Sequence, residues 1–216
     1  MISVVITAGG SSTRFNGNNK LLYELNGKPV ILYSVELFNS LEFIDEIVIS
    51  SNELLIPLFS QMFEKMKKVK IVKGGDTRQK SVFNGLKACD KPDYVLIHDA
   101  ARPFVNRETI ANCLNKAKKT GAAIVAVKTI DTIKVVDENG IITSTPDRAT
   151  LWNAQTPQIF RYDLILSLHE KYSDLNFTDD SLLFEKAGLP VAISQGDYSN
   201  IKITTIQDVE KINNKD

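Results

Sequence analysis

The chain has 216 residues, of which 43% are hydrophobic and 24% charged, and this balance excludes a disordered, collagen-like or membrane-spanning chain. Lysine plus arginine equals aspartate plus glutamate at 26 each, so no global charge would hold the chain on nucleic acid or on an anionic membrane surface. Any binding of anions must therefore be local.

Short β-branched runs alternate with segments of helical periodicity along most of the chain. In chain order the pattern predicts a strand at 2–7, a helix at 29–39, a strand at 47–51, a helix at 54–67, a strand at 69–72, a helix at 80–88, a strand at 94–98, a helix at 107–120, a strand at 122–127, and helices at 163–172, 180–187 and 205–213. This alternation predicts one α/β domain over residues 1–216, built on a Rossmann-like, mostly parallel sheet covered by helices on both faces.

One stretch breaks the alternation. Residues 132–136 and 141–144 are β-prone runs joined by Asp-Glu-Asn-Gly, a hairpin signal, and the strand-like run 150–160 follows. We therefore expect a β-arm inserted at about 132–156. Because a long two-stranded ribbon is only marginally stable alone, we expect the arm to pack on a second subunit in a homodimer. A hairpin folded back on its own domain is the alternative.

The N-terminal segment and the cysteines indicate the compartment. Residues 1–8 form an apolar run without a basic region or a cleavage site, and no later stretch is long enough to span a bilayer. Cys89 and Cys113 are the only cysteines, and neither belongs to a metal-type spacing or a CxxC pair. We expect a cytoplasmic protein with two buried, reduced thiols, in preference to a disulfide or a thiol nucleophile.

The loop after the first predicted strand contains Ala8, Gly9 and Gly10, with Arg14 and Lys20 further on. Glycines let backbone N–H groups approach phosphate oxygens, and a loop at this edge of a parallel sheet is where ligands usually bind. The spacing matches neither GxGxxG nor GxxxxGK[ST], which argues against a dinucleotide-dependent oxidoreductase and a P-loop NTPase. A glycine loop alone could be a simple tight turn, but the two flanking cations favour a nucleoside triphosphate.

Seven short blocks follow one another along almost the whole chain. They are Ala8-Gly9-Gly10 with Arg14 and Lys20, GGDTRQKSV at 74–82, HDAARPF at 98–104, DTIK at 131–134, a block at 148–160 that contains WNAQTPQ, TDD at 178–180 and NIKIT at 200–204. In this order and spacing they resemble the 2-C-methyl-D-erythritol 4-phosphate cytidylyltransferases of the non-mevalonate isoprenoid pathway. The first loop departs from that family's Ala-Ala-Gly-x-Gly-Thr-Arg pattern through its second glycine and its two serines.

The resemblance implies that CMP is transferred from CTP to 2-C-methyl-D-erythritol 4-phosphate, with release of pyrophosphate and with Mg²⁺ or another divalent cation as cofactor. The attacking phosphate oxygen is already anionic, so this reaction needs no serine, cysteine or histidine nucleophile. It needs cations that align two anions and stabilise the developing charge. By resemblance the catalytic residues are Arg14, Lys20 and Lys202.

The resemblance also implies binding roles. The nucleotide would contact Ala8, Gly9, Gly10, Gly75, Ser81 and Asp99, and Asp99 would also bind the metal. On local grounds alone, Ser81 could equally be a helix cap and Asp99 a turn former or helix cap. Without a metal cluster or a nucleophile beside it, His98 is interpreted as structural.

The polyol phosphate would bind to the residues Arg102, Thr132, Arg148 and Thr156. Of these, Thr132 and Arg148 would come from the partner subunit's arm, and Asp180 is placed near the site without a defined role. Two other functions stay open: a ribitol 5-phosphate cytidylyltransferase and a non-catalytic nucleotide sensor. Ala101, Lys134 and Trp152 favour methylerythritol over ribitol, and the retention of Lys20, Asp99 and Lys202 argues against the sensor.

Overall fold

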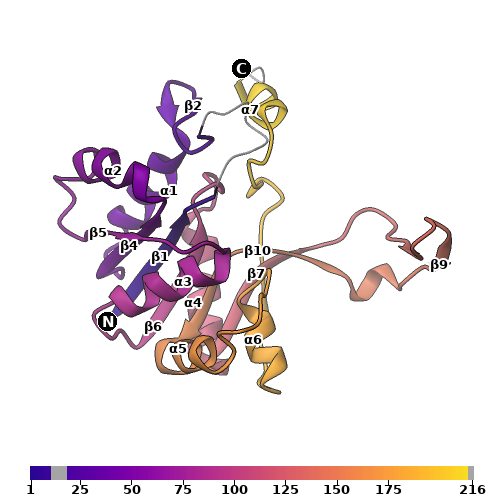
Figure 1. The fold of residues 1–216 in the computed structure, drawn as a ribbon. Helices are drawn as coiled ribbons and strands as arrows, with labels where there is room; N and C mark the ends of the chain where they lie inside the picture. The colour runs from indigo at the N-terminus through magenta and orange to yellow at the C-terminus, as the bar shows by residue number, and fades with distance from the viewer. Residues whose placement is uncertain (11–18, 214–216) are drawn as a thin grey trace.

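A seven-stranded sheet runs through the centre of the computed structural model, which describes residues 1–10 and 19–213 (Figure 1). Its strands lie in the order β11-β7-β10-β6-β1-β4-β5. All neighbouring pairs are parallel except the two that β10 makes with β6 and β7. The strands are β1 (Ile2–Ala8), β4 (Glu46–Ser51), β5 (Val69–Lys73), β6 (Tyr94–Asp99), β7 (Ala122–Lys128), β10 (Trp152–Arg161) and β11 (Ala192–Gln195).

Helices cover both faces of this sheet (Figure 1). They are α1 (Val30–Ser40), α2 (Ile56–Met62), α3 (Arg78–Ala88), α4 (Arg107–Thr120), α5 (Tyr162–Lys171), α6 (Ser181–Lys186) and α7 (Ile206–Asn213), with short 3₁₀ turns η1 (Glu53–Leu55) and η2 (Arg148–Thr150). A small two-stranded sheet, β2 (Glu24–Leu25) with β3 (Lys28–Pro29), precedes α1. The predicted α/β class with a mostly parallel sheet is confirmed.

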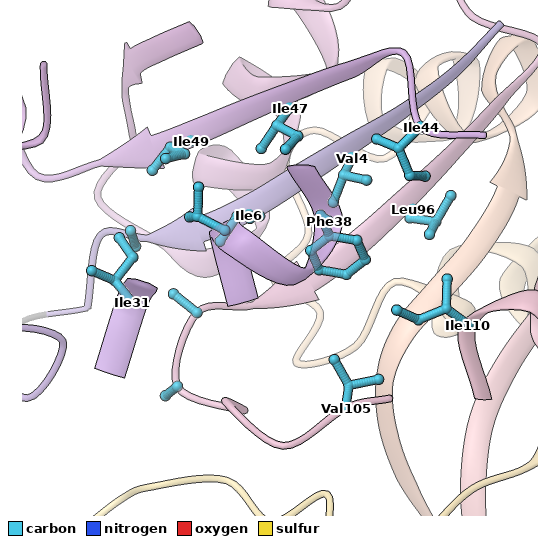
Figure 2. Packing of buried hydrophobic residues seen from close by; sticks show 14 of the residues in the cluster. Val4, Ile6, Ile31, Phe38, Ile44, Ile47, Ile49, Leu96, Val105 and Ile110 are labelled. Atoms are coloured by element: carbon cyan, nitrogen blue, oxygen red, sulfur yellow. The ribbon is translucent and has the colours of Figure 1, made fainter. Parts of the chain in front are cut away.

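Alternate residues of the buried strands feed two separate cores. In β1, Val4 and Ile6 belong to the core that packs on α1, α2, α4 and α7, and Val5 belongs to the core under α3, α5 and α6. This alternation follows from the two-residue period of a strand. Figure 2 shows the first core, in which Phe38 of α1 lies against the sheet near Val4 and Leu96.

Local signals explain where the helices begin and end. The Asn106 side chain accepts a 2.8 Å hydrogen bond from the Thr109 amide at the start of α4, and Gly121 ends that helix with a φ of +86°, a conformation that glycine adopts without strain. Helix α3 approaches β1 so closely that a Cβ on Gly85 would lie 2.4 Å from Val5 Cγ1. The missing side chain therefore sets the distance between α3 and the sheet.

The predicted strands and helices agree with the structure, with three differences. The helix predicted at 54–67 is shorter, because α2 ends at Met62 and the chain continues in turns. Strand β11 and the small β2–β3 sheet were not predicted. The run predicted at 150–160 becomes β10, a member of the central sheet.

The chain leaves the central sheet after Lys128 and rejoins it at Trp152, which pairs with Lys128. Between them, β8 (Val135–Val136) and β9 (Ile142–Ser144) form a separate antiparallel hairpin that extends away from the body of the protein (Figure 1). The arm predicted at about 132–156 overlaps this excursion, but its last residues belong to the central sheet. The alternative of a hairpin folded back on its own domain is wrong for this chain.

Candidate active site

A cavity of about 370 Å³ opens at the carboxyl edge of the central sheet. Thr7 of β1 and Asp99 of β6 are register partners there, so two neighbouring parallel strands bring side chains to one place, as expected for ligand sites of open α/β sheets. The lining consists of Thr7, Ala8, Gly9, Gly10, Lys20, Leu21, Gly75, Asp76, Thr77, Arg78, Ser81, Asp99, Ala101 and Lys202. Residues from remote parts of the chain therefore share one cavity.

The loop between β5 and α3 folds around the hydroxyl of Ser81. The Gly75 amide donates a 3.0 Å hydrogen bond to Ser81 Oγ, which in turn donates to the Thr77 carbonyl oxygen at 2.9 Å. A Cβ on Gly75 would lie 2.3 Å from the Cβ of Lys80, so this position requires glycine. Thr77, not Ser81, is the N-cap of α3, and the helix-cap interpretation of Ser81 is therefore wrong.

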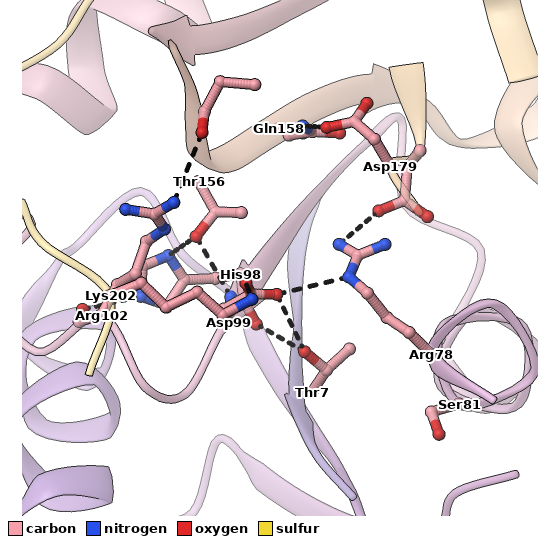
Figure 3. A network of polar contacts seen from close by, with 12 residues as sticks. Thr7, Arg78, Ser81, His98, Asp99, Arg102, Thr156, Gln158, Asp179 and Lys202 are labelled. Carbon is pink, nitrogen blue, oxygen red and sulfur yellow. Dashed lines mark hydrogen bonds and ion pairs between the residues drawn. The ribbon is translucent and has the colours of Figure 1, made fainter. Parts of the chain in front are cut away.

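Asp99 is a buried carboxylate with cations on both of its oxygens (Figure 3). Lys202 Nζ lies 2.5 Å from Oδ2, and Arg78 Nε lies 3.4 Å from Oδ1, which also accepts a 3.3 Å hydrogen bond from the Thr7 hydroxyl. Burial alone would raise the pKa of Asp99, but Arg78 and Lys202 outweigh it and hold that pKa well below its usual range. The carboxylate is therefore ionised at neutral pH.

Arg78 is a residue that sequence reasoning missed. Its guanidinium bridges two carboxylates, because Nη2 lies 2.7 Å from Asp180 Oδ2 while Nε faces Asp99. Burial opposes the charge of Arg78, but the two acids raise its pKa, so it stays protonated. Its position in the first turn after the Gly74-Gly75 loop is the signal that could have placed it at the cavity.

His98 and Thr156 form a buried support behind the cavity. Thr156 Oγ1 accepts a 3.1 Å hydrogen bond from the Asp99 amide, so its own proton is available to His98 Nδ1 at 3.0 Å. His98 Nε2 then donates to the Arg102 carbonyl oxygen at 3.1 Å. Burial lowers the pKa of His98 to about 4, which keeps the ring neutral at pH 7. The expected structural role of His98 is confirmed, and Thr156 lies within the same network.

Two further cations approach the same edge of the sheet. Arg102 donates from Nη1 to the Asn200 carbonyl oxygen at 2.7 Å and from Nη2 to the Ala154 carbonyl oxygen at 3.3 Å. Lys20 donates to the carbonyl oxygen of Ile203 at 3.2 Å, one residue after Lys202. These contacts tie the 200–203 segment to the rest of the site.

Four of the predicted residues are absent from the cavity lining: Arg102, Thr132, Arg148 and Thr156. Thr132 and Arg148 lie on the exposed arm, where Arg148 Nη1 donates to the Ile130 carbonyl oxygen at 2.8 Å. Arg14 lies outside the described residues. The remaining predicted nucleotide and catalytic residues, Ala8, Gly9, Gly10, Lys20, Gly75, Ser81, Asp99 and Lys202, all line the cavity.

The described carboxylates of the site could hold a divalent cation only together with ligands from elsewhere. No group of three or more His, Cys, Asp or Glu side chains within residues 1–10 and 19–213 could hold a metal. Asp99 offers hard carboxylate oxygens at the cavity wall. It therefore fits a magnesium ion that takes most of its ligands from phosphate oxygens and water.

Both cysteines are buried and unpaired. Burial raises the pKa of each thiol to about 12, so neither is a thiolate nucleophile at neutral pH. The predicted burial of both thiols is confirmed. Across the described part of the chain, no helix combines the length and the apolar character needed to cross a membrane.

Comparison with known sequences gives a match over nearly the whole chain. A family model described as 2-C-methyl-D-erythritol 4-phosphate cytidylyltransferase matches residues 2–213. The protein of that name from Caldanaerobacter subterraneus subsp. tengcongensis is 46% identical over 216 residues, which cover 96% of this chain and 95% of that protein. The one from Bacillus licheniformis is 45% identical over 212 residues, with 95% and 91% covered.

Comparison with solved structures leads to the same family as the sequence comparison. The crystal structure of a 4-diphosphocytidyl-2C-methyl-D-erythritol synthase from Anaerococcus prevotii is similar with a TM-score of 0.90 and 37% identity, over 98% of this chain and 94% of that one. A 2-C-methyl-D-erythritol 4-phosphate cytidylyltransferase from Thermus thermophilus follows with a TM-score of 0.82 and 29% identity, over 98% and 96%. The similarity covers sequence and fold together.

Proposed function

Because the chain belongs to the 2-C-methyl-D-erythritol 4-phosphate cytidylyltransferase family, we propose that it transfers CMP from CTP to 2-C-methyl-D-erythritol 4-phosphate and releases pyrophosphate. The observation that carries this proposal is the convergence of Lys20, Asp99 and Lys202 on one cavity beside the Gly75 loop. A cavity with two lysines on its lining suits two anionic substrates.

The nucleotide would enter with its cytosine against the loop held by Ser81. The space for the base depends on small residues, namely Gly9, Gly75 and Ser81. A side chain on Gly9 would narrow this space, because its Cβ would lie 3.3 Å from Ser81 Oγ. Backbone groups of this loop would read the edge of the base, and the triphosphate would extend toward Ala8, Gly10 and Lys20.

The reaction forms one bond and breaks one. An oxygen of the polyol phosphate bonds to the α-phosphorus of CTP, while the bond from that phosphorus to the oxygen of the β-phosphate breaks and pyrophosphate departs. Lys202 would align the incoming phosphate, and Lys20, with Arg14, would stabilise the charge on the triphosphate. Arg102 would contact the polyol phosphate, and Thr156 would support the site from behind through its hydrogen bond with the Asp99 amide.

We propose Mg²⁺ as the cofactor, with Asp99 as its protein ligand. When bound, the ion would neutralise phosphate charge and orient the triphosphate for in-line attack. Arg78 supports this role because it holds Oδ1 of the carboxylate at 3.4 Å. The ionised state of Asp99 suits a hard cation.

We further propose a cytoplasmic homodimer formed through the arm. Apolar side chains of the arm are exposed, among them Ile133, Val135, Val136, Ile141 and Ile142, and such a surface favours burial against another protein. In a dimer, Thr132 and Arg148 of one subunit would complete the partner's site. Two reduced cysteines fit a reducing compartment.

The proposal is tested by supplying the purified chain with CTP, ATP, GTP or UTP and with methylerythritol 4-phosphate or ribitol 5-phosphate, and measuring pyrophosphate with and without EDTA. We expect release with CTP and methylerythritol 4-phosphate, and its loss with EDTA. Release only with ribitol 5-phosphate would identify the other polyol, and no release with any pair would favour a nucleotide sensor.

A further inference from the structure

A line of polar contacts runs from helix α5 into the cavity. His169 Nε2 lies 3.4 Å from one oxygen of Asp180, and the other oxygen lies 2.7 Å from Arg78. Arg78 lies 3.4 Å from Asp99, and Asp99 lies 2.5 Å from Lys202. Figure 3 shows Arg78 reaching toward Asp99 from the end of its helix. The chain of contacts links a residue outside the cavity to the lysine proposed to align the substrate.

Asp180 cannot touch the nucleotide. Its side chain is 2% exposed, and it is absent from the cavity lining. Burial alone would raise the pKa of Asp180, but Arg78 and His169 outweigh it and lower that pKa. Asp180 is therefore a buried anion, and of its two ion-pair partners Arg78 is the one that lines the cavity.

The position of Asp180 is fixed by its neighbours. Asp179 accepts hydrogen bonds from the Ser181 amide at 2.8 Å and from Gln158 of β10. The Ser181 amide also lies 3.3 Å from Gln158 Oε1. These contacts fasten the start of α6 to the central sheet, and so the carboxylate of Asp180 has a defined place before any ligand binds.

Arg78 uses separate edges of its guanidinium for the two acids. Nη2 meets Asp180 and Nε meets Asp99, and Nη1 is buried without a hydrogen-bond partner in the described part of the chain. Because the guanidinium is planar and rigid, the angle between these two edges is fixed. A lysine keeps the charge but has one ammonium, so it cannot hold both carboxylates in the same geometry.

We propose that Asp180 is a positioning residue for the transfer reaction. It anchors Arg78, so that Arg78 occupies Oδ1 of Asp99 and leaves Oδ2 to Lys202. Without the charge of Asp180, Arg78 turns toward Asp99 and the triphosphate, and Lys202 loses its alignment. This inference rests on the proposed function and adds a residue to it.

The test uses the full chain and steady-state pyrophosphate release with CTP and methylerythritol 4-phosphate. We expect Asp180→Asn to lower kcat by about 10- to 100-fold, the scale of a misplaced reacting group, with the KM for CTP changed by less than about threefold. Arg78→Lys should give a similar loss. Asp163→Asn, a matched change at an exposed carboxylate paired with Arg161, should leave kcat unchanged.

The double variant Arg78→Gln/Asp180→Asn separates positioning from folding. Asp180→Asn takes from the buried Arg78 one of its two carboxylate partners, which lowers the thermal midpoint. Removing both charges restores part of that midpoint. We expect kcat to stay low in this double variant, because Oδ1 of Asp99 has still lost Arg78, the first of its two cations. Recovery of kcat together with the midpoint would show a purely structural role and overturn the inference.

The outcomes also separate this inference from the proposed function. An active wild type whose Asp180→Asn variant keeps its kcat refutes the positioning role alone. A wild type that releases no pyrophosphate from CTP refutes the proposed function. If Asp180→Asn does not fold, Arg78→Lys and the double variant decide, because both keep the local charge balanced or nearly so.

Discussion

Replacing Lys202 with methionine removes one charge from the cavity and keeps most of the apolar length of the side chain. Lys202 Nζ lies 2.5 Å from Asp99, and its side chain is 39% exposed. A pair of this exposure is screened by solvent, and Asp99 keeps its contacts with Arg78 and Thr7. We therefore expect the free energy of unfolding to fall by only about 1 kcal/mol.

The effect on catalysis should be much larger. If Lys202 aligns the incoming phosphate and stabilises the transition state, its loss should lower kcat by about 10²–10³-fold, or about 2.7–4 kcal/mol of barrier. The loss of unfolding free energy is small because the Lys202–Asp99 pair is solvated in the folded chain. The rise in the barrier is larger because Lys202 also stabilises charge that develops only during the reaction.

Urea unfolding and steady-state pyrophosphate release on the same preparation measure both quantities. Lys116→Met is a matched control: Lys116 donates to an oxygen of another element, the Ile193 carbonyl oxygen at 2.7 Å, as Lys202 does to the Asp99 carboxylate, but Lys116 lies outside the cavity lining. A folded Lys202→Met variant that keeps more than about a third of the wild-type kcat would refute the assignment.

Three further expectations follow. Gly75→Ala should raise the KM for CTP by about tenfold or more, because the new Cβ would lie 2.3 Å from that of Lys80 and must displace the loop. Initial rates measured across CTP concentrations give this KM, and an unchanged value would contradict the expectation. Ile142→Asp on the exposed arm should shift sedimentation toward the monomer, whereas an unchanged sedimentation coefficient would count against dimerisation through the arm. Between pH 6.5 and 4 the unfolded chain binds a proton at His98 that the folded chain excludes, since burial lowers the pKa of His98 to about 4. The free energy of unfolding, measured in urea, should therefore fall on the order of 3 kcal/mol as pH drops through this window, and His98→Gln should lack that part of the slope.

The sequence alone predicted the elements whose pattern is local. Strands β1, β4 and β6 are buried on both faces. Their sequences are therefore short runs of mostly apolar residues between helical segments, which predict buried strands. Because such strands end at one edge of the sheet, the glycine loop and Asp99 could be placed together before the structure was known.

Features that depend on contacts between remote segments could not be predicted in this way. Strand β11 has a partly exposed, mixed sequence and gains its place by pairing with β7. The antiparallel return of β10 into the sheet likewise depends on its neighbours. No local pattern shows that Arg78 bridges Asp99 and Asp180, because the three residues belong to different elements that meet only in the folded chain.

A crystal structure of the chain with CTP and Mg²⁺ would test the central claim most directly. We expect the triphosphate in the cavity at the carboxyl edge of the sheet, with phosphate oxygens about 3 Å from Lys20 and the cytosine against Gly75 and Ser81. A nucleotide bound on another face, or with its triphosphate directed away from Lys20, Asp99 and Lys202, would contradict it.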